Sequence, residues 1–318
     1  MLIATIRRTL KQVSLLSSEL SAGVVRCKGG AHNVDSEARC RNRMRAGMID
    51  VHTHLHPPRL SAAIRRWFDE RSSWRIVHPT EPRAVAAALR AAGVERFVFC
   101  SYAHKPGMAA ELNAWLAQTS RDLDAYGLPL ATVHLDDPNP LADLRGALDD
   151  GCIGLKIHED VQRFAADDPR MDALYAELAA RDAFALIHVG PIPWDHKTND
   201  GPRRIATILA RHPRLRLVVA HLGVPDTLAF FALAQRFPNF FLDTTMAFVS
   251  PDLLTTARGS DVEAAAGAVV YGSDYPNIPY PYAAERDALE ALGLSTAARR
   301  AILFENARRL SPKLAALK

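Results

Sequence analysis

The stretch MIDVHTHLHP, residues 48–57, guides the interpretation of the rest of this 318-residue chain. Its apolar beginning predicts a β-strand, in which side chains alternate between two faces. His52 and His54 are two residues apart, so they project from the same face, about 7 Å apart along the strand. Histidine is the commonest metal-ligating side chain, and this spacing suits two ligands of one ion. Two packed, hydrogen-bonded histidines are the structural alternative at this point.

After this strand, the sequence alternates between short apolar runs and longer segments of helical period. The apolar runs, rich in β-branched residues, lie at 49–52, 94–100, 130–134, 153–158, 184–189, 215–221, 240–243 and 268–272. Apolar residues recur at three- and four-residue steps at 84–92, 107–121, 140–149, 171–181, 203–211, 226–237, 252–266 and 282–292. Eight strands, each followed by a helix, predict an α/β fold of the (β/α)8 TIM-barrel type. An open doubly wound sheet would favour a glycine-rich turn after its first strand, and residues 52–57 do not form one.

The composition is that of a globular chain that can bury a large core, with 48% hydrophobic and 23% charged residues. No apolar run approaches the roughly 18 residues that a membrane-spanning helix needs. Four cysteines without close pairing predict free thiols and a reducing, cytoplasmic compartment.

The basic residues are concentrated at the start of the chain. Residues 1–47 hold nine arginine or lysine residues and three acidic residues, whereas the whole chain has a net charge of +4. The basic excess therefore belongs to this segment and does not argue for nucleic-acid binding. We interpret residues 1–47 as a disordered or dispensable extension and residues 48–318 as the TIM-barrel domain. The extension also loosely resembles an organellar transit peptide, which is the alternative.

Polar side chains recur at the carboxyl ends of the predicted strands, where the active sites of TIM barrels lie. A single histidine at a strand end is more often a structural hydrogen-bonding residue. Five strands with such ends are hard to attribute to chance, so we expect these side chains to converge on one site. They are His52, His54, Lys156, His158, His188, His221 and Asp274.

The residue types suggest a role for each of these side chains. His52, His54 and His188 supply three neutral nitrogens and Asp274 an anionic oxygen, a set that suits a divalent metal with room for a bound water. Such an ion lowers the pKa of the water and can polarise a substrate carbonyl. Asp274 is the expected base, and His221 is the expected hydrogen-bond donor or second acid that stabilises the oxyanion.

Lys156 and His158 share one face of the fourth strand. A lysine that points into a metal-lined barrel can be carboxylated, and it then bridges to a second metal. It can instead remain an ammonium that binds an anionic substrate, and a lysine that extends out to solvent is the structural alternative. Zinc is the expected ion, with one per site, or two if Lys156 is also a ligand.

Five short motifs contain the side chains at the strand ends. They are His52-x-His54, Gly154-Leu-Lys156-Ile-His158, Leu186-Ile-His188, Val219-Ala-His221-Leu-Gly223 and Tyr271-Gly-Ser-Asp274-Tyr-Pro276. Together they resemble the motifs of the amidohydrolase superfamily, in particular the amidohydrolase-related (amidohydrolase 2) TIM-barrel metal-dependent hydrolases. The likeness runs in order from Met48 to about Leu310. It implies that His52, His54, His188 and Asp274 are the metal ligands and that His221 is the histidine of the sixth strand. The superfamily varies at the position of Lys156, which leaves the number of metal ions open.

Residues in the loops after the strands are expected to shape the substrate pocket. Arg163 and Lys105 would suit a carboxylate or another anion, and two solvated loop cations are the alternative. Trp194 and His158 are further candidates for substrate binding. The other loop residues expected to shape the pocket are Tyr102, His104, Gln162, Phe164 and His196. Weaker candidates are His56, Asp136, Asp243 and Asn277.

These features predict an enzyme that hydrolyses a small amide, lactone or ester through metal-activated water. The alternative is a metal-dependent non-oxidative decarboxylase of a small aromatic carboxylic acid, because the same branch of the superfamily contains such enzymes. A catalytically inactive barrel would predict broken ligand motifs, and none is broken here. The expected partner is a small-molecule substrate, with no nucleic acid and no membrane, and the sequence leaves a homodimer open.

Overall fold

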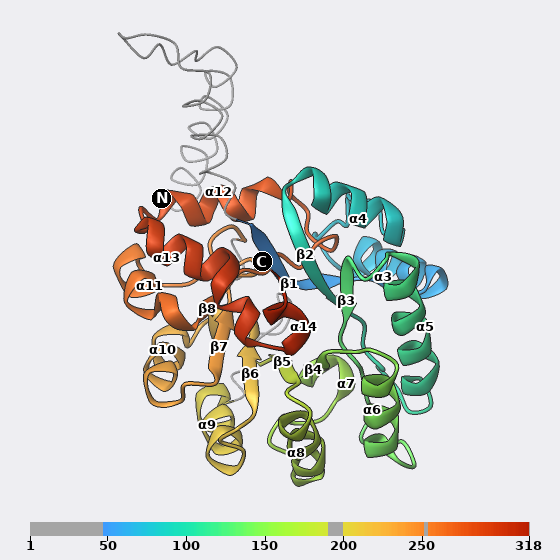
Figure 1. The fold of residues 1–318 in the computed structure, drawn as a ribbon. Helices are drawn as coiled ribbons and strands as arrows, with labels where there is room; N and C mark the ends of the chain where they lie inside the picture. Colours follow the sequence, from blue (N-terminus) through green and yellow to red (C-terminus); the bar gives the residue numbers. More distant parts are fainter. Residues whose placement is uncertain (1–46, 190–199, 251–253, 318) are drawn as a thin grey trace, which may run out of the picture. The chain divides into compact units, whose positions relative to one another are not determined.

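The structure is a computed structural model that describes residues 47–189, 200–250 and 254–317. Within these ranges, eight parallel strands alternate with helices, which confirms the predicted TIM-barrel fold (Figure 1). Residues 1–46 and Trp194 and His196 lie outside the described residues, so the structure does not test the predictions made for them. The strands are β1 (Met48–His54), β2 (Val94–Cys100), β3 (Gly127–Pro129), β4 (Gly154–His158), β5 (Phe184–His188), β6 (Arg216–Val219), β7 (Phe240–Asp243) and β8 (Val269–Val270).

Figure 1 shows the helices around the ring of strands, with α14 lying across one end of the ring. The α-helices are α3 (Pro58–Arg71), α4 (Pro82–Ala91), α5 (Ala109–Asp122), α6 (Pro140–Asp149), α7 (Glu159–Gln162), α8 (Asp172–Ala180), α9 (Gly201–Arg211), α10 (Thr227–Arg236), α11 (Gly259–Ala265), α12 (Ala283–Ala291), α13 (Thr296–Arg300) and α14 (Pro312–Ala315). Short helical turns are η2 (Pro169–Met171), η3 (Ala220–Gly223), η4 (Ala266–Ala268), η5 (Ala301–Glu305) and η6 (Ala307–Arg309).

The strands form two hydrogen-bonded groups, β1 to β3 and β4 to β8, and backbone bonds between these groups close the barrel. On one side, the Ala131 N–H donates to the Gly154 carbonyl at 2.8 Å, and the Lys156 N–H donates to the Ala131 carbonyl at 2.9 Å. On the other side, the Asp274 N–H donates to the His52 carbonyl at 2.8 Å. This closure brings the end of β8 next to the end of β1.

The third strand differs from the sequence prediction, which placed it at 130–134. The regular ladder is found at Gly127–Pro129, with only an isolated bridge between Ala131 and Leu155 beyond it. The side chain of Asn113 on α5 bonds both backbone groups of Thr132, accepting from its N–H at 2.8 Å and donating to its carbonyl at 2.9 Å. A side chain therefore takes the place of a neighbouring strand at Thr132.

Strands β6 and β8 are also shorter than predicted, because the chain turns at the site. Strand β6 ends at Val219, since His221 and Leu222 have left-handed φ values of 56° and 51°. Strand β8 covers only Val269–Val270 of the predicted 268–272. The sequence analysis also missed helix α3, which follows β1 and lies over the barrel mouth.

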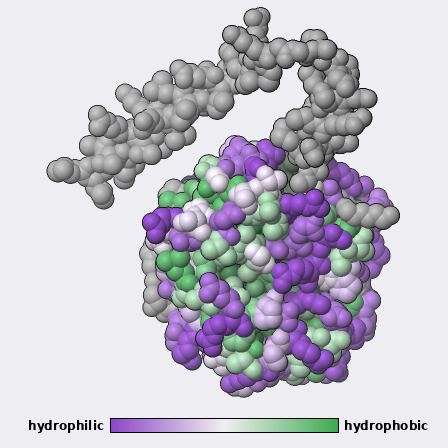
Figure 2. Space-filling model, turned by 60° about the vertical axis from the view of Figure 1, so that its left-hand side comes forward, coloured by the Kyte–Doolittle hydropathy of each residue, from purple (hydrophilic) through white to green (hydrophobic). Residues whose placement is uncertain are grey.

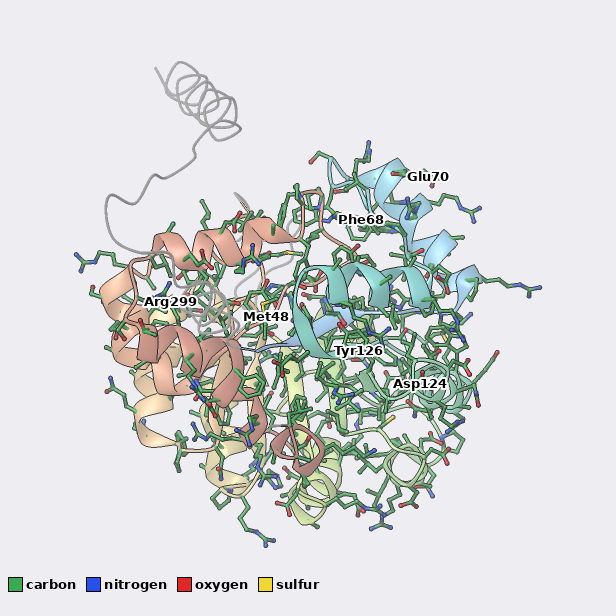
Figure 3. All side chains as sticks on the ribbon, turned by 45° about the horizontal axis from the view of Figure 1, so that its top comes forward. Met48, Phe68, Glu70, Asp124, Tyr126 and Arg299 are labelled. Atoms are coloured by element: carbon green, nitrogen blue, oxygen red, sulfur yellow. The ribbon has the colours of Figure 1, made fainter. Side chains whose placement is uncertain are left out.

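The hydrophobic core has an inner and an outer layer. The inner layer lies inside the barrel, where Val51, Phe184 and Phe241 pack with residues near the end of the chain such as Leu310 and Leu314. The outer layer fills the space between strands and helices (Figure 3). The end of the chain therefore closes the end of the barrel at which the strands begin and leaves the carboxyl ends free for a site.

Figure 2 shows one face of the molecule, on which hydrophilic side chains form a broad area with smaller apolar areas among them. None of the helices in the described ranges combines the length and the hydrophobicity needed to cross a membrane.

Candidate metal centre

Both histidines of β1 face the interior because the strand is irregular at this point. The pairing of β1 with β2 shifts register between Asp50 and Thr53. Val51 packs in the inner core layer, yet the next residue, His52, also faces inward and contacts Lys156. Such irregularities are over-represented next to active sites, where they redirect a side chain. The predicted juxtaposition of His52 and His54 is therefore present, with ring centroids 5.2 Å apart.

The carboxylate of Asp274 lies between these two rings. Its Oδ1 atom is 2.7 Å from Nε2 of His54 and 3.2 Å from Nε2 of His52. Asp274 has a φ of 64°, a left-handed conformation that is unusual for a residue with a side chain. Burial opposes ionisation of Asp274, but the charge and hydrogen bond of His54 lower its pKa well below the usual value, so the carboxylate is ionised.

Asp243, at the end of β7, orients the ring of His52 and the backbone at His221. Its Oδ2 accepts from Nδ1 of His52 at 2.9 Å, and its Oδ1 accepts the backbone N–H groups of His221 at 2.9 Å and Thr245 at 3.1 Å. Burial opposes ionisation, but the interactions with His52 and His221, including the hydrogen bonds that Asp243 accepts from them, lower the pKa of Asp243 to about 2. Because an ionised carboxylate can only accept, the proton of His52 is on Nδ1, and its Nε2 lone pair faces the site.

The protons of His221 and His188 can be placed in the same way. Nδ1 of His221 lies 3.1 Å from the Thr245 carbonyl oxygen, which can only accept, so Nδ1 carries the proton. Nε2 of His221 therefore accepts from Nδ1 of His188, 3.0 Å away. This leaves Nε2 of His188 as a lone pair, and it is buried without a hydrogen-bond partner in the described part of the chain.

The pKa values of the two β1 histidines shift in opposite directions. Burial and the charge of Lys156 lower the pKa of His52 to about 4, so this ring is neutral. Burial would also lower the pKa of His54, but the neighbouring Cys100 and Asp274 raise it to about 10. The Asp274 side of His54 is thus a place that favours positive charge.

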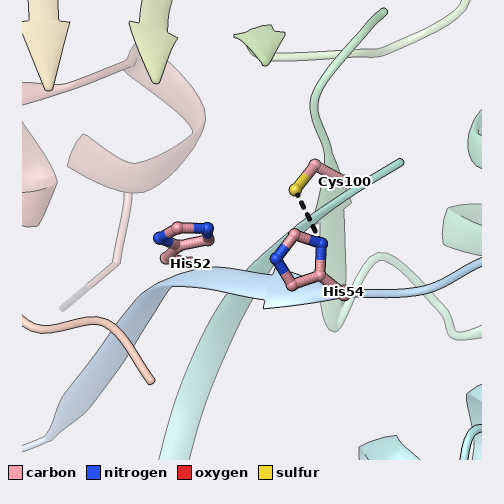
Figure 4. A group of neighbouring side chains, drawn as sticks. All are labelled: His52, His54 and Cys100. Carbon is pink, nitrogen blue, oxygen red and sulfur yellow. Dashed lines mark hydrogen bonds between the residues drawn. The ribbon is translucent and has the colours of Figure 1, made fainter. Parts of the chain in front are cut away.

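Several of these groups are close enough to hold one ion. The ligand atoms of His52, His221 and Asp274 lie within 4.8 Å of one another, and so do those of His52, His54 and Cys100 (Figure 4). Cys100, at the end of β2, is a site residue that the sequence analysis did not single out. Its position at the end of a strand was the available signal.

This donor set fits a divalent metal ion. Imidazole nitrogens with one carboxylate oxygen are ligands typical of zinc. The partnerless Nε2 of His188 points to the same conclusion, because a buried polar atom normally has a partner. His188 reaches the group through His221, so proximity favours His221 as a ligand and the partnerless atom favours His188. His188 is the better candidate ligand, because both nitrogens of His221 are already hydrogen-bonded.

His158 lies beside this group, and its Nδ1 is also buried without a partner within the described residues. Its ring is stacked on that of His188, with centroids 4.1 Å apart and an interplanar angle of 8°. Burial and the charge of Lys156 lower the pKa of His158 well below its usual value, so the ring is neutral. A neutral buried imidazole that lacks a partner is suited to hydrogen-bond a ligand.

A cavity of about 600 Å³ opens above these residues, within the range typical of small-molecule sites. Its polar side includes His158, His188, His221 and Asp274, and its apolar side is formed by one face of α3 and by Trp74. Of the two loop cations predicted to bind an anion, Arg163 lines the cavity and Lys105 does not. The complete lining is His56, Leu60, Ala63, Ile64, Trp67, Phe68, Trp74, Tyr102, His104, His158, Asp160, Val161, Arg163, His188, His221, Met246, Asp274 and Asn277.

Comparison with known proteins supports this reading of the fold. A family model described as Amidohydrolase matches residues 49–312. None of the curated proteins compared with the chain matches it significantly. The three solved structures described next share 14% to 19% sequence identity with this chain, so their likeness concerns the fold alone.

Three of these structures illustrate the range of similar proteins. An uncharacterized TIM-barrel protein from Bordetella bronchiseptica is 19% identical, with a TM-score of 0.66 over 85% of this chain and 99% of its own. The 5-carboxyvanillate decarboxylase of Sphingomonas paucimobilis is 18% identical, with a TM-score of 0.60 over 84% and 99% of the two chains. A structure from Acinetobacter baumannii titled "probable 2-pyrone-4,6-dicarboxylic acid hydrolase" is 14% identical, with a TM-score of 0.58 over 83% and 98%.

Proposed function

Because this chain belongs to the amidohydrolase family, we propose that it is a metal-dependent hydrolase of a small amide, lactone or ester. The observation that carries this proposal is the position of the Asp274 carboxylate, whose Oδ1 lies near Nε2 of both His52 and His54. A carboxylate and two imidazoles that lie far apart in the sequence therefore meet at one point, and Asp274 also lines the cavity. Such a group is suited to hold a cation and to accept a proton beside it.

The proposed ligands are His52, His54, His188 and Asp274, with Lys156 as a further ligand if it is carboxylated. Zinc is the proposed ion, since it favours nitrogen ligands with one oxygen. When bound, it would lower the pKa of a water molecule and polarise a substrate carbonyl. Asp274 is the proposed base, because its ionised carboxylate lies on the cavity side of the group.

The remaining side chains of the cavity have proposed roles in binding. His221 is held by the Thr245 carbonyl and would stabilise the oxygen on which negative charge develops. His158 would hydrogen-bond a polar group of the substrate through its partnerless Nδ1. Arg163 lines the cavity, and its guanidinium suits a substrate carboxylate.

A second candidate is a non-oxidative decarboxylase of a small aromatic carboxylic acid. The observation that favours it is the aromatic part of the cavity, where Trp67, Phe68, Trp74 and Tyr102 could contact a flat ring. Two of the similar structures are titled as decarboxylases, of 5-carboxyvanillate and of 2,6-dihydroxybenzoate. The same ligands and the same arginine would serve this reaction.

Elemental analysis of the purified protein, followed by a panel of lactones, amides, esters and aromatic carboxylates, tests both candidates. We expect a stoichiometric divalent metal and hydrolysis of a member of the first three classes. Release of carbon dioxide from the fourth class, without hydrolysis, would favour the second candidate. His52→Ala and Asp274→Asn should abolish turnover while the circular dichroism spectrum stays unchanged. Turnover that persists in the metal-stripped double variant would refute a metal-dependent reaction.

A further inference from the structure

Cys100, the last residue of β2, lies behind His54 on the side away from Asp274. Its Sγ atom is 3.4 Å from Nδ1 of His54 and 3.4 Å from the carbonyl oxygen of Thr53. Figure 4 shows the sulfur next to this ring nitrogen. The side chain is buried, with a relative exposure of 1%. The thiol therefore contacts two polar groups of β1 and is shielded from solvent.

Counting donors and acceptors fixes the direction of both contacts. A thiol has one proton to donate, and the carbonyl oxygen of Thr53 can only accept. The S–H group of Cys100 therefore points to Thr53, and the sulfur accepts the proton of Nδ1 of His54. Nε2 of His54 faces the ionised carboxylate of Asp274, 2.7 Å from its Oδ1, and also carries a proton in this structure. A cation that binds at Nε2 would replace that proton, whereas the proton on Nδ1 would remain.

No other described side chain is placed to do the same for His54. The hydroxyl of Tyr102 is 3.3 Å from both ring nitrogens, so it lies beside the ring and not along the direction of the Nδ1 proton. His52 and His221 have their own Nδ1 partners, the Asp243 carboxylate and the Thr245 carbonyl. Cys100 is thus the acceptor at Nδ1 of His54, as Asp243 is for His52 and Thr245 is for His221.

We propose that Cys100 is a positioning residue, which keeps the proton of His54 on Nδ1 and directs Nε2 to the bound cation without binding the cation itself. This inference rests on the proposed metal centre. The two nitrogens of an imidazole point away from each other, so a sulfur at Nδ1 does not reach an ion bound at Nε2. Partners of this kind typically contribute 10- to 100-fold to metal affinity.

Cys100→Ala and Cys100→Ser test the proposal, with Cys152→Ala as a matched control. Cys152 is likewise buried, and it lies just before β4, at the other end of the barrel from the site. Cobalt(II) and zinc affinities of the metal-stripped proteins are measured by competition with a chromophoric chelator. We expect affinity to fall about 10- to 100-fold in Cys100→Ala, to be largely restored in Cys100→Ser, and to be unchanged in Cys152→Ala.

Two results would overturn the proposal. One is an unchanged cation affinity in Cys100→Ala. The other is a thiolate-to-cobalt charge-transfer band in the wild-type protein that disappears in Cys100→Ser, because it would make Cys100 a ligand. If Cys100→Ala does not fold, the cobalt affinity of Cys100→Ser and the cobalt spectrum of the wild-type protein still distinguish a positioning residue from a ligand.

A readout that needs no metal separates this inference from the proposed function. Wild-type protein that binds no divalent cation would refute the metal centre but not the hydrogen bond. In ¹⁵N-histidine-labelled, metal-free protein, the Nδ1 proton of His54 should give a slowly exchanging NMR signal. The signal should persist in Cys100→Ser and be lost in Cys100→Ala, and its persistence in Cys100→Ala would contradict the role given to the thiol.

Discussion

The Nζ atom of Lys156 lies 2.7 Å from Nε2 of His52, in the direction from which a cation would approach that nitrogen. Lys156 is fully buried, and its amine forms no ion pair with a carboxylate among the described residues. An ammonium and a metal ion cannot share one lone pair, and two adjacent positive charges repel each other. The lysine must therefore be carboxylated or move when a cation binds to His52.

The first prediction compares Lys156→Met with Lys156→Glu. If Lys156 is a carboxylated ligand, the methionine variant should lose cation affinity by about 10-fold or more. The glutamate variant should retain much of it, because its carboxylate can replace the carbamate. Metal content after dialysis, measured by elemental analysis, checks this. Tighter binding in Lys156→Met would show instead that the lysine is an ammonium that competes with the cation.

The second prediction separates His188 from His221. His188→Asn should lower cation affinity, because the partnerless Nε2 of His188 is the proposed ligand. His221→Asn should leave most of the affinity intact and reduce kcat by about 10²- to 10³-fold, the usual cost of losing a group that stabilises the oxyanion. Metal content and kcat are measured on the same preparations. The reverse pattern would make His221 the ligand, as its proximity to His52 and Asp274 allows.

The third prediction uses Arg163 and Lys105 as a matched pair of loop cations. Arg163 lines the cavity, whereas Lys105 is exposed and does not line it. Arg163→Ala should raise KM for a substrate with a free carboxylate about 10-fold or more, because a charge-assisted hydrogen bond is lost. The same variant should leave KM for the methyl ester of that substrate nearly unchanged. Lys105→Ala should alter neither value, and an equal effect of both variants would point to general electrostatics instead.

The fourth prediction concerns Glu285 on α12, which links two loops at the cavity. It accepts the Tyr280 hydroxyl and the backbone N–H of Met246. Burial raises its pKa from 4.5 to about 8, so the folded protein holds this proton more tightly than the unfolded chain does. The contribution of Glu285 to stability is therefore greatest below about pH 4.5 and falls as the pH rises to about 8.

The test is the pH dependence of urea unfolding in wild-type protein and Glu285→Gln. Between pH 5 and pH 8 the wild-type protein should lose stability relative to the variant, by about 1.4 kcal/mol for each unit of pKa shift. The comparison between the two proteins matters because burial also raises the pKa of Asp50, to about 7, and this carboxyl titrates in both. Parallel curves for the two proteins would show that Glu285 ionises normally.

Much of the architecture follows from the order of residues alone. The alternation of apolar runs and helical segments predicted the barrel, and the bounds of β2, β7 and α6 agree with the structure to the residue. The gathering of His52, His54, His221 and Asp274 also followed from their positions at strand ends. These features are local, because side-chain periodicity is a property of each segment, and parallel strands then bring their carboxyl ends together.

Other features depend on contacts between distant segments. The sequence did not reveal that Asn113 ends the third strand, that α3 forms a wall of the cavity, or that Arg163 and not Lys105 reaches it. The position of Cys100 at a strand end was a signal for the site, but the pairing of β1 with β2 that places its sulfur behind His54 is visible only in the folded chain.

The sequence by itself determined which groups are available to bind a cation, since imidazoles and a carboxylate at strand ends of a closed barrel have to face the same opening. Only the tertiary structure decided which nitrogen of each ring faces the other site residues. That choice is made by the acceptor behind the ring, which is Asp243 for His52, Cys100 for His54 and Thr245 for His221. These acceptors come from the end of β2 and from the end of β7 with the loop after it, far in sequence from the rings that they contact. Hydrogen bonds form only over distances of about 3 Å, or slightly more for sulfur, which the folded chain alone establishes.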